Sequence, residues 1–504
     1  MIQLILADVL TLDSKRPQAE AVLCAGGRII AVGDRDDMQA LSQGFDVETL
    51  DRRGYVLTPA LTDSHIHLVS YGFSLDKLHL DGFHNVFELQ LGLQEFAQRR
   101  PEMQWIEGLG FSVTGLGLYE YPHKSWLNEI CPDRPVILRS KDLHAVWINS
   151  RALALSGIGV DTPDPPGGRI VRDDQGKPTG VLLESAMRLV ERVMPVPTEA
   201  EYLAAARRGV HQMRAYGYGA VHTLAFEPPE ALAALQTLDA RGELPLRVWA
   251  CLPHDQLESA RALGLRGGSG GHIRLGGVKF LADGTLGSRT AWLKQGYADG
   301  TGTGISLDSP EVMFERGRQA LEMGFSMVVH AIGDRANSET LEVFRKLKPL
   351  ADARKIRLRL EHAQHLDPTD LLKIAQLGIA VSMQPVHLKQ DVASIRSLLP
   401  NLCSTSFACK TLIQNGAIVA FGSDAPVASP EPRLSFEAAT TRYGFETQQC
   451  VTPSEWLYAH TRGAALSVGW NFYGVIREGA RADFTLWDRL GGEAQALVLS
   501  SQII

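Results

Sequence analysis

The sequence lacks an excess of positive charge and any long apolar run. Its 57 acidic residues outnumber its 50 lysines and arginines, and the net charge of −7 argues against a nucleic acid or an anionic membrane as partner. No apolar run approaches the roughly twenty residues that a membrane span needs. The first residues reach Asp8 without a basic segment, so no signal peptide is expected. We therefore expect a soluble, cytoplasmic protein.

Cysteine is also scarce. The six cysteines are scattered and form no C-x-x-C pair, which favours reduced thiols over a disulfide framework. The remaining composition, 45% hydrophobic and 21% charged, is ordinary for a globular protein with a substantial core. A length of 504 residues exceeds the usual size of one domain, but α/β barrels run long as single units.

A repeat of amphipathic helix followed by short apolar strand fills most of the chain. The helix from Glu199 to Tyr216, for example, ends before Gly217 and leads into the strand 219–222. The expected strands lie at residues 56–64, 219–222, 246–251, 273–280, 326–330, 357–362, 379–382 and 418–424. About eight strands alternating with helices predict a (β/α)8 TIM-type barrel of class α/β.

Two other regions do not fit this repeat. Strand-like segments at both chain ends predict one small domain, a β-sandwich built from residues 1–55 and 466–504 around a barrel of residues 56–465. Residues of about 70–195 hold a helix over 86–99, possible strands at 104–107 and 136–139, and a hairpin around Asp174. We interpret them as a long insertion after the first barrel strand that caps the barrel mouth.

The first barrel strand carries a His-x-His pair. Side chains alternate along a strand, so His65 and His67 project from the same face and can converge on one ion. A His-x-His pattern is short, so by itself it could be two histidines that bind no metal. Whether the pair is a metal site depends on whether the rest of the chain supplies further ligands.

Further polar residues stand at the ends of other predicted strands. Functional groups of a barrel sit at the C-terminal ends of its strands. The residues at those ends are His65, His67, Lys279, His330, His362 and Asp424. Alone, each has a simpler explanation, such as a core histidine or a helix N-cap. Together, imidazole and carboxylate ligands suit a divalent ion such as zinc.

These motifs resemble the amidohydrolase superfamily, and specifically its N-substituted formamide deformylase-like branch (amidohydrolase family 3). The resemblance covers nearly the whole chain. Besides His-x-His, it rests on residues 161–169, 178–182, 278–291, 330–336, 361–364, 382–385, 422–427 and 474–483. Phe111-Ser112 and Thr223 depart from residues that are common in the branch, which removes no metal ligand but leaves the substrate pocket undefined.

The resemblance implies a site of one or two metal ions. His65, His67 and Asp424 would hold one ion, and His330 and His362 a second. Lys279, carboxylated on its amine, would bridge the two; the alternative is a free amine beside a single ion. The metal would activate a water and polarise the scissile carbonyl, and Asp424 would be the catalytic residue that shuttles the proton.

Four residues are weaker candidates for substrate binding: His144 in the insertion, Arg289 after the fourth strand, and Gln384 and His387 after the seventh. Arg289 could instead pair with Asp283, and His144 could be satisfied within the insertion. His222, at the end of the second strand, could lie behind the ligands.

We therefore expect a metal-dependent hydrolase of non-peptide carbon–nitrogen bonds in a small molecule, with N-substituted formamides as one candidate class. A lactone or ester hydrolase on the same metal site, or a non-catalytic binding protein on the same fold, are the alternatives. Homodimers are common among soluble enzymes, so a homodimer is the assembly to test for.

Overall fold

The apolar segments form the strands of a parallel barrel. In the computed structural model, which describes residues 2–141, 144–225 and 227–498, these strands are almost wholly buried, as a parallel sheet covered by helices requires. The strands are β5 (Leu61–Ile66), β12 (Tyr218–Thr223), β13 (Arg247–Pro253), β14 (Ile273–Leu281), β15 (Ser326–Ala331), β16 (Arg359–His362), β17 (Ala380–Met383) and β18 (Ile418–Phe421). They pair in chain order from β5 to β18, a nearly closed eight-stranded barrel as the sequence predicted.

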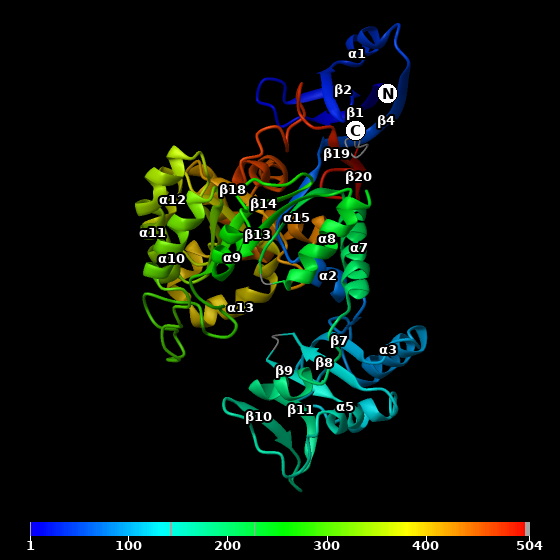
Figure 1. The fold of residues 1–504 in the computed structure, drawn as a ribbon, viewed down its shortest axis with the longest axis vertical. Helices are drawn as coiled ribbons and strands as arrows, with labels where there is room; N and C mark the ends of the chain where they lie inside the picture. Colours follow the sequence, from blue (N-terminus) through cyan, green and yellow to red (C-terminus); the bar gives the residue numbers. More distant parts are fainter. Residues whose placement is uncertain (1, 142–143, 226, 499–504) are drawn as a thin grey trace. The chain divides into compact units, whose positions relative to one another are not determined.

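Helices connect the barrel strands and cover their outer faces (Figure 1). They are α7 (Glu199–Ala215), α8 (Pro229–Ala240), α9 (Leu257–Ala262), α10 (Pro310–Glu322), α11 (Asp334–Ala353), α12 (Asp370–Gln376), α13 (Leu388–Leu398), α14 (Cys409–Gln414) and α15 (Pro432–Thr441). Local signals set their ends. Ser309 caps α10 by accepting a hydrogen bond from the Val312 amide, and Gly217, with a φ of 89°, follows α7.

The first barrel strand begins later than the sequence suggested. We expected it from residue 56, but Val56–Pro59 ends the long strand β4 (Val47–Pro59), whose residues 56–59 pair with β19 (Asp483–Trp487). The barrel strand starts at Leu61. The amide of the residue before it, Ala60, donates a hydrogen bond to the carbonyl of Asp483 in β19. The two sheets therefore meet at this point of the chain.

Strands from both chain ends form one six-stranded sheet. Its order is β20-β19-β4-β1-β2-β3, with β1 (Ile2–Leu10), β2 (Gln18–Ala25), β3 (Arg28–Gly33) and β20 (Ala494–Val498). On one face, Met38 of α1 (Arg35–Ser42) packs with Leu4, Leu6 and Leu23. The second β layer of a sandwich stays a prediction, as do the exact domain boundaries. Leu499, the last residue of the predicted terminal strand, and residues 500–504 lie outside the described residues.

Residues Phe73–Glu201 form a separate compact unit, distinct from Met1–Gly72 with Tyr202–Ile504. Its sheet order is β10-β11-β9-β8-β7-β6, and the helix predicted over 86–99 is α3 (Val86–Arg99). The strands are β6 (Leu78–His79), β7 (Ile106–Phe111), β8 (Val136–Ser140), β9 (Ala145–Ile148), β10 (Gly168–Arg172) and β11 (Pro178–Glu184). The hairpin predicted around Asp174 is β10–β11. Asp142 and Leu143 lie outside the described residues.

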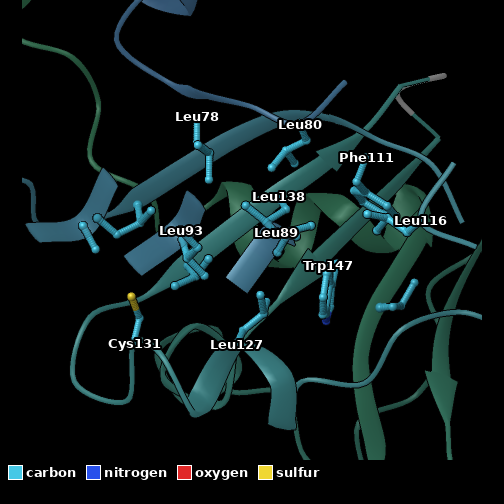
Figure 2. Close-up of a cluster of buried hydrophobic side chains, with 14 of the residues drawn as sticks. Leu78, Leu80, Leu89, Leu93, Phe111, Leu116, Leu127, Cys131, Leu138 and Trp147 are labelled. Atoms are coloured by element: carbon cyan, nitrogen blue, oxygen red, sulfur yellow. The ribbon is translucent and has the colours of Figure 1, made fainter. Parts of the chain in front are cut away.

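This unit has its own hydrophobic core (Figure 2). Leu89 and Leu93 recur four positions apart on α3, and both are fully buried with Leu138 of β8. Trp147 of β9 is fully buried and packs edge-on against Phe111 and Trp126, each with ring centroids 6.1 Å apart. The unit thus buries apolar side chains independently of the barrel.

No described helix is long and apolar enough to cross a membrane. The six cysteines are free, as the scattered spacing predicted.

Replacing Trp147 by alanine should destabilise the 73–201 unit. Removal of a fully buried tryptophan leaves a cavity, at a cost of about 3–5 kcal/mol in unfolding free energy. Hydrogen exchange of the β8 and β9 amides should accelerate accordingly. The control is Phe87→Ala, whose side chain is 68% exposed and should change stability by no more than about 0.5 kcal/mol. Equal exchange rates in the two variants would contradict this account of the core.

Candidate metal centre

His65, His67 and Asp424 converge at the C-terminal end of β5. His65 lies on the strand and His67 just beyond it. The Nε2 atoms of both histidines lie 3.4 Å from Oδ1 of Asp424. One ligand atom from each residue can be chosen so that all lie within 4.8 Å of one another. Three residues predicted as ligands are therefore close enough to share one ion.

Backbone contacts between the first and last barrel strands place Asp424 beside the histidines. The Asp424 amide donates to the His65 carbonyl (2.6 Å), and the His67 amide to the Ala425 carbonyl (2.9 Å). Asp424 adopts a left-handed φ of 61°. A Cβ on Gly422 would lie 2.4 Å from the His65 nitrogen, so this close approach needs glycine.

A buried carboxylate ties the same two segments together. Oδ1 of Asp63 accepts hydrogen bonds from the amides of His65 (3.0 Å) and Ser423 (3.1 Å). Burial raises the pKa of Asp63 to about 7. Sequence inspection did not select Asp63, although an acidic residue inside the predicted strand 56–64 was a signal that could have found it.

Behind His65 lies a buried charged network. The Nδ1–H of His65 donates to Glu361 (2.6 Å), which leaves Nε2 facing Asp424. Glu361 in turn accepts from Arg359, and both side chains are fully buried. Burial alone would raise the pKa of Glu361, but Arg359 holds it well below its usual range. Glu361 thus stays an anion that fixes the orientation of His65.

Arg359 also reaches neighbouring barrel strands. It donates to Nδ1 of His222 (2.8 Å) and to the Ser64 carbonyl, and it stacks over Trp249 with its guanidinium carbon 5.3 Å from the ring centroid. His222 therefore contacts Arg359 rather than the ligand histidines. Sequence reasoning did not select Arg359 or Glu361, although two charges in the four-residue strand β16 were a signal.

His330 and His362 form a second histidine pair. Their ring centroids are 4.5 Å apart, and the His362 ring is 4.8 Å from that of His65. Nε2 of His330 donates to the Gly284 carbonyl (3.1 Å), and Nδ1 of His362 to the Gln384 side-chain oxygen (2.7 Å). The other ring nitrogens, Nδ1 of His330 and Nε2 of His362, form no hydrogen bond with the described residues.

Lys279, on β14, is only 2% exposed. Within the described part of the chain its amine has no hydrogen-bond or ion-pair partner. Burial lowers its pKa, because an ammonium ion loses its hydration in the interior. An unpaired buried ammonium is costly, so a neutral amine or a carbamate suits this position better.

Three of the four histidines, namely His65, His330 and His362, are held in the neutral form that metal binding requires. Burial lowers the pKa of His65 and of His330 to about 4, and that of His362 well below its usual value. Burial also acts to lower the pKa of His67, but the hydrogen bond and charge of Asp424 raise it overall. Neutral imidazoles beside an anionic carboxylate are the donor set of a divalent ion, so the residues fit a metal.

The substrate-side candidates differ in position. Gln384 is 2% exposed and its oxygen is bonded to His362, so it lies behind a histidine rather than in an open pocket. His387 approaches the site, with Nε2 3.9 Å from Oδ2 of Asp424. That nitrogen is buried and has no hydrogen-bond partner in the part of the chain described.

Arg289 and Asp283 do not form the ion pair that the sequence allowed. Arg289 pairs with Asp299 (2.6 Å) and is largely exposed. Asp283 instead accepts hydrogen bonds from the amides of Trp292, Ile332 and Gly333. It thereby joins the loops after β14 and β15. His144 belongs to the 73–201 unit, where it pairs with Glu184 (3.0 Å).

Comparison with known proteins agrees with this geometry. The chain is 31% identical over 501 residues to YtcJ of Bacillus subtilis, which is named as an amidohydrolase (95% of this chain, 92% of YtcJ). It is 26% identical to the N-substituted formamide deformylase of Arthrobacter pascens (97% and 93% covered). An uncharacterized metal-dependent hydrolase from Pyrococcus horikoshii has the same fold, with a TM-score of 0.81 and 26% identity (97% and 98% covered).

A family model described as the amidohydrolase family matches residues 48–500, which include every metal ligand that the sequence predicted. This chain therefore belongs to the amidohydrolase family and is a hydrolase of carbon–nitrogen bonds.

Proposed function

We propose that this hydrolase cleaves a non-peptide amide bond of a small molecule, with N-substituted formamides as the first class to test. The observation that carries the proposal is the convergence of His65, His67 and Asp424 within 4.8 Å. Family membership supports it, and so does the likeness to the formamide deformylase.

The proposed ligands divide into two sets. His65, His67 and Asp424 would hold one zinc ion, and His330 and His362 a second. Lys279 would lie between the sets as a carbamate, which replaces a buried ammonium by an anionic oxygen ligand. Its unpaired, buried amine supports this assignment.

A divalent ion supplies Lewis acidity when bound, which polarises a carbonyl and lowers the pKa of a coordinated water. Asp424 would act as the catalytic base. Its Oδ1 faces the two histidines, so Oδ2, on the side of His387, is the atom placed to accept a proton from the attacking water. The same oxygen would then return that proton to the leaving nitrogen.

His387 would position the substrate. Its unpartnered Nε2 lies beside Oδ2 of Asp424, where it can bond an oxygen or nitrogen of the bound molecule. Arg289 and His144 remain proposals for substrate contact. Gln384, the fourth candidate for substrate contact, would also orient His362 through the hydrogen bond of its side-chain oxygen.

A panel of amides, N-substituted formamides, esters and lactones tests the reaction class. We expect turnover of one or more amides, and loss of about a thousandfold or more in Asp424→Asn, because that variant removes the proton acceptor. Turnover confined to oxygen esters and lactones would contradict the amide assignment. A metal-loaded protein that turns over nothing while binding a partner would support a non-catalytic role.

Elemental analysis of wild type and Lys279→Ala tests the bridging role. We expect about two ions per chain in wild type and one or fewer in the variant, since the proposed bridge is lost. Lys346→Ala, on the exposed face of α11, is the matched control and should keep the wild-type content. About one ion in both wild type and Lys279→Ala would show that Lys279 is not a bridge.

Glu361→Gln tests the orientation of His65. The substitution keeps the shape of the side chain but removes the negative charge that holds the Nδ1–H, and metal affinity should fall about 10–100-fold. Competition with a chelator measures the change, and circular dichroism checks the fold. Glu258→Gln, at a side chain that is 62% exposed, is the control. Unchanged affinity in Glu361→Gln would exclude an orienting role.

A further inference from the structure

A cavity of about 590 Å³ lies at the end of the barrel opposite the histidines. Arg247 is the first residue of β13 and Arg274 the second of β14, so both stand at the N-terminal ends of parallel strands. Arg28 of β3 and Arg481, just before β19, come from the terminal sheet. The cavity thus forms where the barrel and the terminal sheet meet, and its volume is that of a small-molecule site.

The charge of this cavity is one-sided. Four arginines line it together with His272, and none of the lining residues is acidic. The whole chain, in contrast, carries a net charge of −7. Asp483 neutralises one guanidinium through its ion pair with Arg247 (2.9 Å), and His272 is paired with Asp239 (3.4 Å). A local excess of positive charge therefore remains.

Among the described residues, three of the four guanidinium groups have no carboxylate within ion-pair distance. Arg28 donates to the Gly479 carbonyl (2.8 Å). In the described ranges, neither Arg274 nor Arg481 has a side-chain hydrogen bond or an ion pair. Partial burial lowers the pKa of Arg481, and repulsion from the other three arginines lowers it further, against the opposing attraction of the Asp483 carboxylate. Clustered like charges cost free energy, and an anion bound between them would remove that cost.

The cavity also has an aromatic wall. Trp470 and Tyr473 contact each other edge-on, with centroids 5.7 Å apart, and Phe472 is 61% exposed at the same segment. Such rings can stack on a flat ligand, and guanidinium groups bind phosphate oxygens in pairs. A long nucleic acid would be repelled by the acidic remainder of the protein, whereas a small molecule can enter a local basic cavity.

We propose that this cavity binds a small aromatic molecule with two or more phosphate groups, of the nucleoside diphosphate type. The phosphates lie between Arg274, Arg481 and Arg28, and the ring lies against Phe472 and Trp470. The site is separate from the metal centre and does not depend on the proposed reaction.

Binding of ADP to the metal-loaded protein, measured by isothermal titration calorimetry, tests the proposal. We expect saturable binding by wild type and an affinity lower by about tenfold or more in the double variant Arg274→Gln/Arg481→Gln, since charged hydrogen bonds are lost. Phe472→Ala should weaken binding as well. Arg318→Gln, on the exposed face of α10 and paired with Glu315 and Glu322, is the control and should bind as wild type does.

Two results would overturn the proposal. One is the absence of saturable ADP binding in wild type; the other is unchanged affinity in the double variant. Because phosphate oxygens also bind metals, the titration is repeated on His67→Ala. Binding that survives in that variant but is lost in the arginine pair supports the cavity, whereas the reverse assigns ADP to the metal centre. Because the side chains of Arg274 and Arg481 form no hydrogen bond or ion pair with the residues that the structure describes, the two substitutions remove no such contact and are compatible with a folded protein.

Discussion

The contact between the first and last barrel strands is the constraint on which the rest of the site depends. A parallel barrel that pairs its strands in chain order must still join its two ends. Here the join uses the amides of Asp424, His67 and Ser423, with the Asp63 carboxylate bonded to both segments. The predicted ligands of the first ion are the residues that make this join. Closing the barrel and assembling the metal ligands are therefore one structural event.

The charged network behind the ligands follows from that arrangement. An imidazole holds a metal best when its other nitrogen is fixed by an acceptor. Glu361 is this acceptor for His65, and a buried carboxylate needs a cation, which Arg359 supplies. The remaining N–H groups of Arg359 donate hydrogen bonds to the Ser64 carbonyl and to Nδ1 of His222. One ligand thus requires a chain of polar partners across the barrel interior.

Much of this arrangement could be read from the sequence. A strand such as β15 is predictable because its apolar residues by themselves favour a buried strand. A histidine at the C-terminal end of such a strand lies at the end of the barrel where functional groups gather. The partners of buried charges could not be read, since they depend on contacts between distant segments. The sequence allows an ion pair between Asp283 and Arg289, but Asp283 accepts hydrogen bonds from three backbone amides, and Arg289 pairs with Asp299. The substrate contact of Gln384 stays a prediction, whereas the hydrogen bond of its side-chain oxygen with His362 is a contact that the sequence did not reveal.

The join between Asp63 and Ser423 spans 360 positions of the chain. Contacts of such sequence separation form slowly, because much of the chain must be ordered before they can be made. His65 and His67 lie at the end of the first barrel strand, whereas their carboxylate partner Asp424 follows the seven other described barrel strands in the sequence. An ion that needs all three ligands will bind tightly only to a chain with a finished barrel. Metal uptake would then stabilise the completed fold selectively over every partly folded form.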